Sequence, residues 1–100
     1  MKVLELTLKA KWYDMIESGV KTEEYREVKS YWISRLLRRM SDGSLLYQFK
    51  PYTHVRFRYG YTKRTMTFEI EGLDTGVGNT EWGAIPNRFM FIIKIGKKIC

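Results

Sequence analysis

Cysteine and histidine are scarce in this sequence of 100 residues. The one cysteine, Cys100, has no second cysteine with which to form an intrachain disulfide, and a cysteine-based metal site needs several thiolates. The one histidine, His54, excludes a histidine-rich metal site and is expected to have a structural role. We therefore expect no metal and no other cofactor. A chain without disulfides is typical of a cytoplasmic protein.

Long hydrophobic runs and linkers are also missing. No stretch approaches the roughly 18 apolar residues of a membrane-spanning helix, so we expect no insertion into a membrane. Residues 1–9 alternate apolar with polar side chains, unlike the apolar centre of a signal peptide. No repeat or linker rich in proline and glycine divides the chain, and 44% of the residues are hydrophobic. The sequence predicts a single domain that spans residues 1–100.

Acidic residues are outnumbered by basic ones. Eleven Asp and Glu face 18 Lys and Arg, which gives a formal net charge of +7. The excess is spread, because residues 1–50 hold ten basic and seven acidic residues and residues 51–100 hold eight and four. Such a balance favours polyanionic partners, which include nucleic acids, phosphorylated small molecules and acidic membrane surfaces. It is also found in basic domains that bind none of these.

The first third of the chain changes its hydrophobic period. Residues 2–9 alternate, which predicts a strand with Leu4, Leu6 and Leu8 toward the core. Residues 10–18 have apolar side chains three and four apart, which predicts a short helix that ends at Gly19. Its expected apolar face consists of Trp12, Met15 and Ile16.

A second helix is predicted from Ser30, as its N-cap, through Met40. Its apolar stripe would consist of Trp32, Ile33, Leu36, Leu37 and Met40. Arg35, Arg38 and Arg39 would form the opposite face, which is either solvated or a contact for an anion.

The remainder of the sequence is predicted to be β structure. After a turn at residues 41–43, residues 54–61 and 65–73 alternate as two strands of a hairpin joined by residues 62–64. Glycines and asparagine punctuate residues 72–86, and residues 89–95 form a final buried strand. One strand, two helices and several antiparallel strands predict an α+β fold whose sheet curls into a small β-barrel.

The densest chemistry is the pattern Gly19-x-Lys21-x-x-Glu24-x-Arg26. If the chain is extended from Thr22 onward, Glu24 and Arg26 lie on one face and can pair. The pair would orient the guanidinium, whose remaining N–H groups could reach a phosphate or a base edge, and Lys21 would add a positive charge. A second interpretation stays open: a solvated edge strand whose alternating charges prevent aggregation.

This pattern resembles the GxKxxExR signature of ASCH domains, a family within the PUA-like superfamily of small RNA-associated β-barrels. Residues 6–9, followed by Trp12 and Ile16, are similar to the opening strand and helix of that family, and residues 81–83 are similar to its closing segment. The resemblance implies a barrel with a cleft beside the motif that binds RNA or a nucleotide. It places Lys21, Glu24 and Arg26 in the cleft, with Gly19 as a turn that lets the backbone approach the ligand.

The resemblance also implies an alternative function. Some ASCH-type proteins are amidohydrolases that deacylate acetylcytidine with the motif lysine, a threonine and a downstream glutamate. Lys21 matches, but Glu24 stands in place of the threonine, and Thr22 comes two residues earlier. Glu24 could instead act as a general base on water, and a ribonuclease is a further possibility. The candidate downstream acids are Glu69, Glu71, Asp74 and Glu81.

Basic and aromatic residues outside the motif extend the candidate site. Residues 43–68 contain no acidic residue, and Arg56 and Arg58 share one face of a predicted strand. That face could track a phosphate backbone, or it could be the solvated side of a half-buried strand. Trp82 could line the cleft or pack in the core, whereas Trp12 and Trp32 are expected in the core. A protein-interaction module is a third class, favoured if the protein's own side chains fill the cleft.

Overall fold

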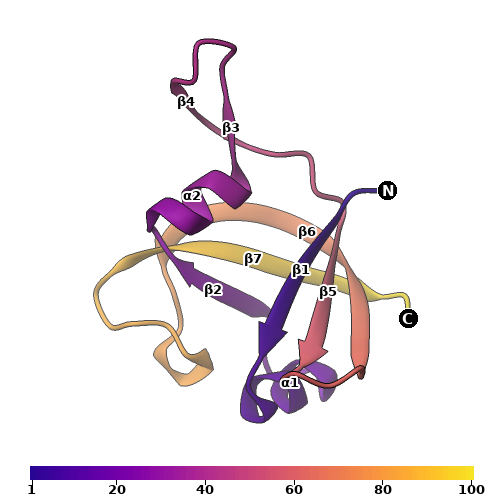
Figure 1. Ribbon diagram of the computed structural model, residues 1–100. Coiled ribbons are helices and arrows are strands. Elements are labelled where there is room, and N and C mark those ends of the chain that lie inside the picture. Colours follow the sequence, from indigo (N-terminus) through magenta and orange to yellow (C-terminus); the bar gives the residue numbers. More distant parts are fainter.

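Five strands form one mixed sheet that curls into a half-barrel (Figure 1). A computed structural model describes residues 1–100. The strands follow one another across the sheet in the order β1-β5-β6-β7-β2. Their bounds are Val3–Leu8 for β1, His54–Tyr59 for β5, Thr65–Val77 for β6, Phe89–Lys98 for β7 and Glu23–Glu27 for β2. β1 pairs with β5 in parallel, and every other neighbouring pair is antiparallel. β1 and β2 stand at the two ends of the strand order and are the edges of the sheet.

The first strand and helix confirm the predicted elements. β1 buries Leu4, Leu6 and Leu8 on one face. α1 (Ala10–Glu17) follows directly, and the chain leaves it through Gly19, whose φ of +85° is readily adopted only without a Cβ. The apolar face of α1 differs in part from the prediction of Trp12, Met15 and Ile16. Tyr13 and Ile16 are its buried residues, whereas Trp12 and Met15 are half-buried.

The second helix is shorter than its apolar period suggests. α2 (Ser30–Leu36) ends four residues before Met40, and the chain passes at once into β3 (Leu37–Arg39), which pairs with β4 (Leu45–Phe49). The prediction of a helix through Met40 is therefore wrong, since a hairpin ladder takes the place of its last turn. Met40 is exposed, and Lys29 rather than Ser30 is the N-cap, without a side-chain capping bond.

The β5–β6 hairpin is confirmed, but β6 is longer than predicted. It runs to Val77, which pairs with Phe89 at the start of β7. Glycines that resemble punctuation in the sequence thus lie inside a strand. The β6–β7 register shifts between Phe68 and Ile70 and again between Ile70 and Gly72. Such irregularities bend a strand and increase its twist, which is how this long strand follows the curl of the half-barrel.

The main core lies inside the curl of the sheet and under both helices. It consists of 13 buried hydrophobic residues, Phe57 and Phe91 among them. A smaller cluster forms where β2 and β7 meet the loop after β6, and it consists of Tyr25, Ala84, Met90 and Ile92. No helix of the fold is both long and apolar enough to cross a membrane.

Candidate functional site

A cleft of about 620 Å³ lies between the two edge strands of the sheet. Its walls are Glu5–Lys9 of β1 and its end, Glu24–Glu27 of β2, Trp12 of α1, and Tyr31, Trp32 and Arg35 of α2. Gly83, Ile85 and Met90 complete the lining. The cleft is therefore the place where the curled sheet does not close into a barrel. It is open rather than filled by the protein's own side chains.

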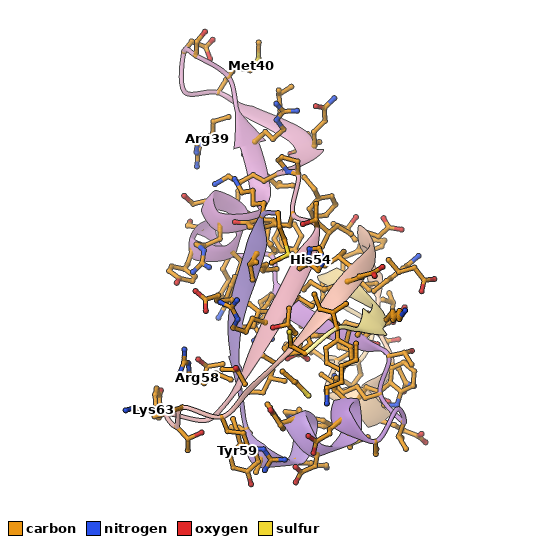
Figure 2. The ribbon with its side chains drawn as sticks, turned by 90° about the vertical axis from the view of Figure 1, so that its right-hand side faces the viewer. Arg39, Met40, His54, Arg58, Tyr59 and Lys63 are labelled. Atoms are coloured by element: carbon orange, nitrogen blue, oxygen red, sulfur yellow. The ribbon has the colours of Figure 1, made fainter.

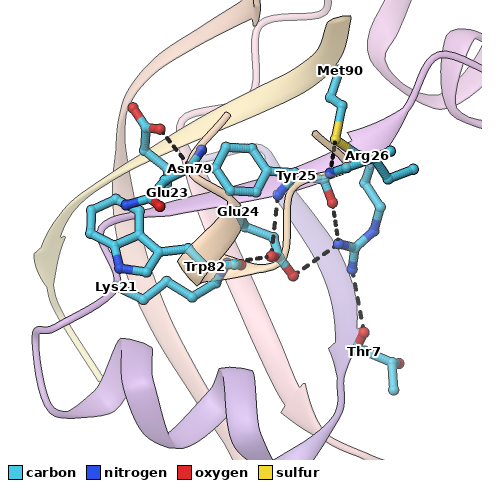
Figure 3. A network of polar contacts seen from close by, with 10 residues as sticks. Thr7, Lys21, Glu23, Glu24, Tyr25, Arg26, Asn79, Trp82 and Met90 are labelled. Carbon is cyan, nitrogen blue, oxygen red and sulfur yellow. Dashed lines mark hydrogen bonds and ion pairs between the residues drawn. The ribbon is translucent and has the colours of Figure 1, made fainter. Parts of the chain in front are cut away.

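The carboxylate of Glu24 is held between two cations at the wall of this cleft (Figure 3). Its Oε1 lies 3.0 Å from Lys21 Nζ and accepts the backbone N–H of Tyr25 at 3.2 Å. Its Oε2 accepts a hydrogen bond from Arg26 Nη1 at 2.8 Å. The predicted pairing of Glu24 with Arg26 is confirmed. Only 5% of Glu24 is exposed, so water hardly competes for its carboxylate and these three donors fix its orientation.

Lys21 pairs with Glu24 from inside the protein. It is 1% exposed and does not line the cleft. Its Nζ also donates to the carbonyl oxygen of Trp82 and lies about 5 Å from two ring centres, those of Trp12 (5.1 Å) and Tyr25 (4.9 Å). Burial lowers the pKa of Lys21, and the neighbouring carboxylate of Glu24 opposes that shift. The ammonium is thus sealed inside the fold as the counter-charge of Glu24.

Most N–H groups of the Arg26 guanidinium donate to acceptors within the protein. Nη1 donates to Glu24 and to the carbonyl of Tyr25 at 2.7 Å, and Nη2 donates to the carbonyl of Thr7 at 3.3 Å. The guanidinium also lies 5.1 Å from the ring centre of Trp32. Since a guanidinium has five N–H donors, two remain for a ligand. Glu24 and Arg26 both belong to the lining of the cleft, and Glu24 Oε2 accepts from Arg26 alone.

Charge is balanced in the cleft. Three basic side chains line it, Lys9, Arg26 and Arg35, and so do three acidic ones, Glu5, Glu24 and Glu27. The formal charges of the lining sum to zero, and the buried Lys21 adds one positive charge behind Glu24, whereas the whole chain carries +7. The lining also includes four aromatic residues, Trp12, Tyr25, Tyr31 and Trp32. A planar group with hydrogen-bonding edges and little charge matches this combination better than a free phosphate does.

Gly19 and Trp82 lie outside the lining of the cleft. Gly19 is exposed and turns the chain out of α1, after which the N–H of Lys21 donates to the carbonyl of Met15 at 3.0 Å. The turn at Gly19 contributes to the site because it directs the chain so that Lys21 enters the interior. Trp82 lies in the 3-10 turn η1 (Thr80–Trp82), and its half-buried ring packs on the smaller cluster. Only its carbonyl reaches the site, through Lys21.

Arg56 and Arg58 lie over β1, beside the cleft rather than in it. They line a separate hollow of about 210 Å³ together with Glu5, Leu6 and Thr7. Those three residues of β1 also line the cleft, so the two cavities share a wall. Arg56 pairs with Glu5 at 3.2 Å, whereas Arg58 donates only to the carbonyl of Thr62.

None of the downstream acids lines the cleft. Glu69 and Glu71 are exposed on β6, Glu81 is exposed in η1, and Asp74 lines a different cavity near the β3–β4 hairpin. The acids that do line it besides Glu24 are Glu5 and Glu27, which sequence reasoning missed. The one available indication was that Glu27 follows the motif directly.

The chemistry of the site is limited by what its side chains touch. No hydroxyl group contacts Lys21, and Thr22 is exposed outside the cleft. No group of three or more His, Cys, Asp or Glu side chains is placed to hold a metal ion. The arrangement can accept and donate hydrogen bonds side by side and can stack a flat group on its aromatic walls. No family model, curated protein or solved structure matches the chain.

Proposed function

We propose that the protein binds RNA or a nucleotide-type ligand, with an unpaired base in the cleft between β1 and β2. The observation that carries the proposal is the fixed carboxylate of Glu24 beside Arg26 in an open, aromatic and charge-balanced cavity. Its volume of about 620 Å³ lies within the range of about 300–1,000 Å³ for small-molecule sites. The curled sheet and the position of the motif at its open seam support an ASCH-like, PUA-like assignment.

The cleft offers both parts of single-stranded base recognition. Aromatic rings stack on any base, and hydrogen bonds read its Watson–Crick edge. The free acceptor on Glu24 Oε2 and the two free N–H donors of Arg26 would meet that edge, since most base edges place a donor next to an acceptor. Phosphates would lie outside, where Arg56 and Arg58 face the neighbouring hollow.

The test compares two tryptophan substitutions of the same kind. Trp32→Leu removes a ring that lines the cleft, and Trp82→Leu removes one that does not. A stacked base contributes about 1–3 kcal/mol, so Trp32→Leu should weaken binding of a nucleoside monophosphate or an oligouridylate at least about fivefold. Trp82→Leu should leave affinity unchanged, with urea unfolding of both variants as a check on folding. Equal affinities for the two variants, or no binding by the parent protein at low salt, would contradict the proposal.

Hydrolysis of an acylated cytidine is the second candidate, favoured by the contact between the buried Lys21 and Glu24. In that reaction Glu24 would accept a proton from water, and the water oxygen would add to the acyl carbon. Glu24 would then return this proton to the N4 nitrogen as the amide bond breaks, which gives acetic acid and cytidine. Incubation with N4-acetylcytidine tests it directly. The activity must disappear in Lys21→Ala, and the absence of cytidine after prolonged incubation would remove this candidate.

A further inference from the structure

The β3–β4 hairpin, residues 37–49, projects from the half-barrel as an arm (Figure 1), while Leu37 and Phe49 at its base pack with the main core. Its two strands pair only with each other. The arm is attached at its base, where the N–H of Lys50 donates to the carbonyl of Leu36 at 2.8 Å and the hydroxyl of Tyr52 donates to that of Arg35 at 2.8 Å. No residue of the arm lines the cleft.

Positive charge gathers on the arm and on the helix that leads into it. Residues 30–50 contain four basic side chains and one acidic one, a net +3 of the total +7. The basic ones are Arg35, which also lines the cleft, and Arg38, Arg39 and Lys50, which do not; none of the four forms an ion pair. The acidic one, Asp42, accepts both the N–H and the hydroxyl of Ser44 within the arm's own turn. Asp42 forms no ion pair with these basic side chains, and with its negative charge counted the segment still keeps its net +3.

Exposed aromatic and apolar side chains accompany this charge. Tyr47 on β4 is 90% exposed, Tyr31 on α2 is 60% exposed and Met40 at the tip of β3 is 51% exposed. A tyrosine held on a strand costs little further entropy when a flat group stacks on it. Arginines interleaved with exposed tyrosines are the combination that binds single-stranded nucleic acids, through phosphates and bases together.

The arm is continuous with the cleft. Tyr31, Trp32 and Arg35 of α2 line the cleft, and α2 passes into β3 without a loop. Figure 2 shows Arg39 near one end of the molecule and Arg58 and Lys63 near the other, all projecting from the same side. The longest dimension of the protein is 42 Å. Basic side chains thus flank a cleft whose own charge is balanced.

We propose that the ligand is a single-stranded RNA several nucleotides long, with one base in the cleft and neighbouring phosphates on Arg38 and Arg39 of the arm. The inference rests on the proposed function and narrows its ligand. A free nucleotide would carry its phosphate within reach of the cleft and would leave the arm unused. Small β-barrels of comparable size bind about 4–16 nucleotides, which a chain extending from cleft to arm would satisfy.

The experiment measures binding of fluorescent oligouridylates, a dinucleotide and one of about ten nucleotides, by anisotropy at salt concentrations of about 50 and 200 mM. The test variant is Arg38→Gln/Arg39→Gln. Its charge-matched control is Lys97→Gln/Lys98→Gln, at the exposed end of β7. Arg39 also donates to the carbonyl of Gly43, so its replacement removes a hydrogen bond within the arm. The single variants Arg38→Gln and Tyr47→Ala are therefore measured as well, because neither side chain makes a hydrogen bond and their loss should leave the arm folded.

The arm variant should bind the longer RNA about tenfold more weakly, and its log–log salt slope should fall by about 1.4, which is about 0.7 for each lost phosphate contact. The dinucleotide should bind the arm variant as tightly as it binds the parent protein. The control should match the parent protein in every measurement.

Several outcomes would overturn the proposal. If the arm variant matches the control, or if the longer RNA binds the parent protein no tighter than the dinucleotide, the arm makes no contact and the cleft proposal stands alone. Equal competition by polyglutamate of the same charge would assign the arm to an acidic protein. Failure of the parent protein to bind either RNA would remove the proposed function as well.

Discussion

Arg26 on β2 donates a hydrogen bond to the carbonyl of Thr7 on β1, and this contact of 3.3 Å joins the two edge strands of the half-barrel. No backbone ladder links those strands. A closed barrel would bury both edges, whereas here one guanidinium bridges the gap and the remaining space is the cleft. The side chain that bridges the two edge strands therefore also lines the cleft.

Replacing Arg26 by lysine should expose this double role. A lysine keeps the charge, but its single nitrogen cannot occupy the separate positions of Nη1 and Nη2, so Glu24, Tyr25 and Thr7 lose a common partner. We expect Arg26→Lys to lower the free energy of unfolding by about 1–3 kcal/mol and to weaken binding of a nucleoside monophosphate. Urea unfolding and a fluorescence titration measure the two effects. Arg88→Lys, at an exposed pair with Glu27, should change neither, and an equal loss in both variants would contradict the bridging role.

The buried ion pair gives a second prediction. Glu24→Gln removes the counter-charge of Lys21, which leaves an ammonium buried and unpaired, and we expect a loss of about 3–5 kcal/mol in the free energy of unfolding. Lys21→Met/Glu24→Gln should recover a large part of this loss, because no charge remains buried. Glu5→Gln breaks only an exposed pair with Arg56 and should cost less than about 1 kcal/mol. A double variant as unstable as Glu24→Gln alone would show that the charge is not the cause.

Alkaline pH should act on stability through Tyr25. Burial and the hydrogen bond to Glu23 raise its pKa from 10.0 to about 12. A raised pKa means that the fold favours the neutral phenol, so this contribution is fully present below pH 10 and is lost between pH 10 and about 12. The difference of about two between the pKa values corresponds to about 2–3 kcal/mol.

The measurement for Tyr25 is the free energy of unfolding at several alkaline pH values, in the parent protein and in Tyr25→Phe. The phenylalanine variant loses two hydrogen bonds, one to Glu23 and one from the N–H of Asn79, so it should be less stable at neutral pH. Its deficit should shrink as the pH rises from 10 toward 12. A deficit that stays constant over that interval would mean that Tyr25 titrates as it does in the unfolded chain.

Two glycines near each other in the sequence should respond in opposite ways to a methyl group. A Cβ at Gly78 would lie 2.5 Å from the ring of Tyr25 and 2.8 Å from the Cβ of Ala84, so Gly78→Ala should cost about 1–3 kcal/mol. A Cβ at Gly72 would meet only the side chain of Lys94 at 3.5 Å, so Gly72→Ala should be neutral or slightly stabilising. Thermal unfolding of both variants tests the pair. Equal destabilisation would mean that the packing around Tyr25 is not tight.

The parts of the fold that follow from short-range patterns could be predicted from the sequence. β1 and the β5–β6 hairpin alternate, α1 has a helical period and a glycine stop, and Glu24 and Arg26 are two residues apart on a strand. The end of α2 could not be predicted in this way. Leu36, Leu37 and Met40 fit a helical period, and only the pairing of β3 with β4 decides against it.

The site depended on contacts that no local pattern contains. Lysine is almost never fully buried unless paired, and what seals Lys21 is a carbonyl 61 residues away and two aromatic rings. The third wall of the cleft was missed for a related reason. Trp32 and Arg35 lie three residues apart on one face of α2, but their residue types predict a core residue and a solvated one, whereas both line the cleft.

The most direct test of the central claim is a titration of ¹⁵N-labelled protein with single-stranded RNA, followed by two-dimensional NMR. If an unpaired base occupies the cleft, the indole N–H signals of Trp12 and Trp32 and the backbone amides of residues 24–27 shift together and saturate at one equivalent. The indole signal of Trp82, whose ring lies outside the lining, serves as the internal reference and stays in place. Saturating shifts confined to surfaces away from the cleft, or none at low salt, would contradict the account.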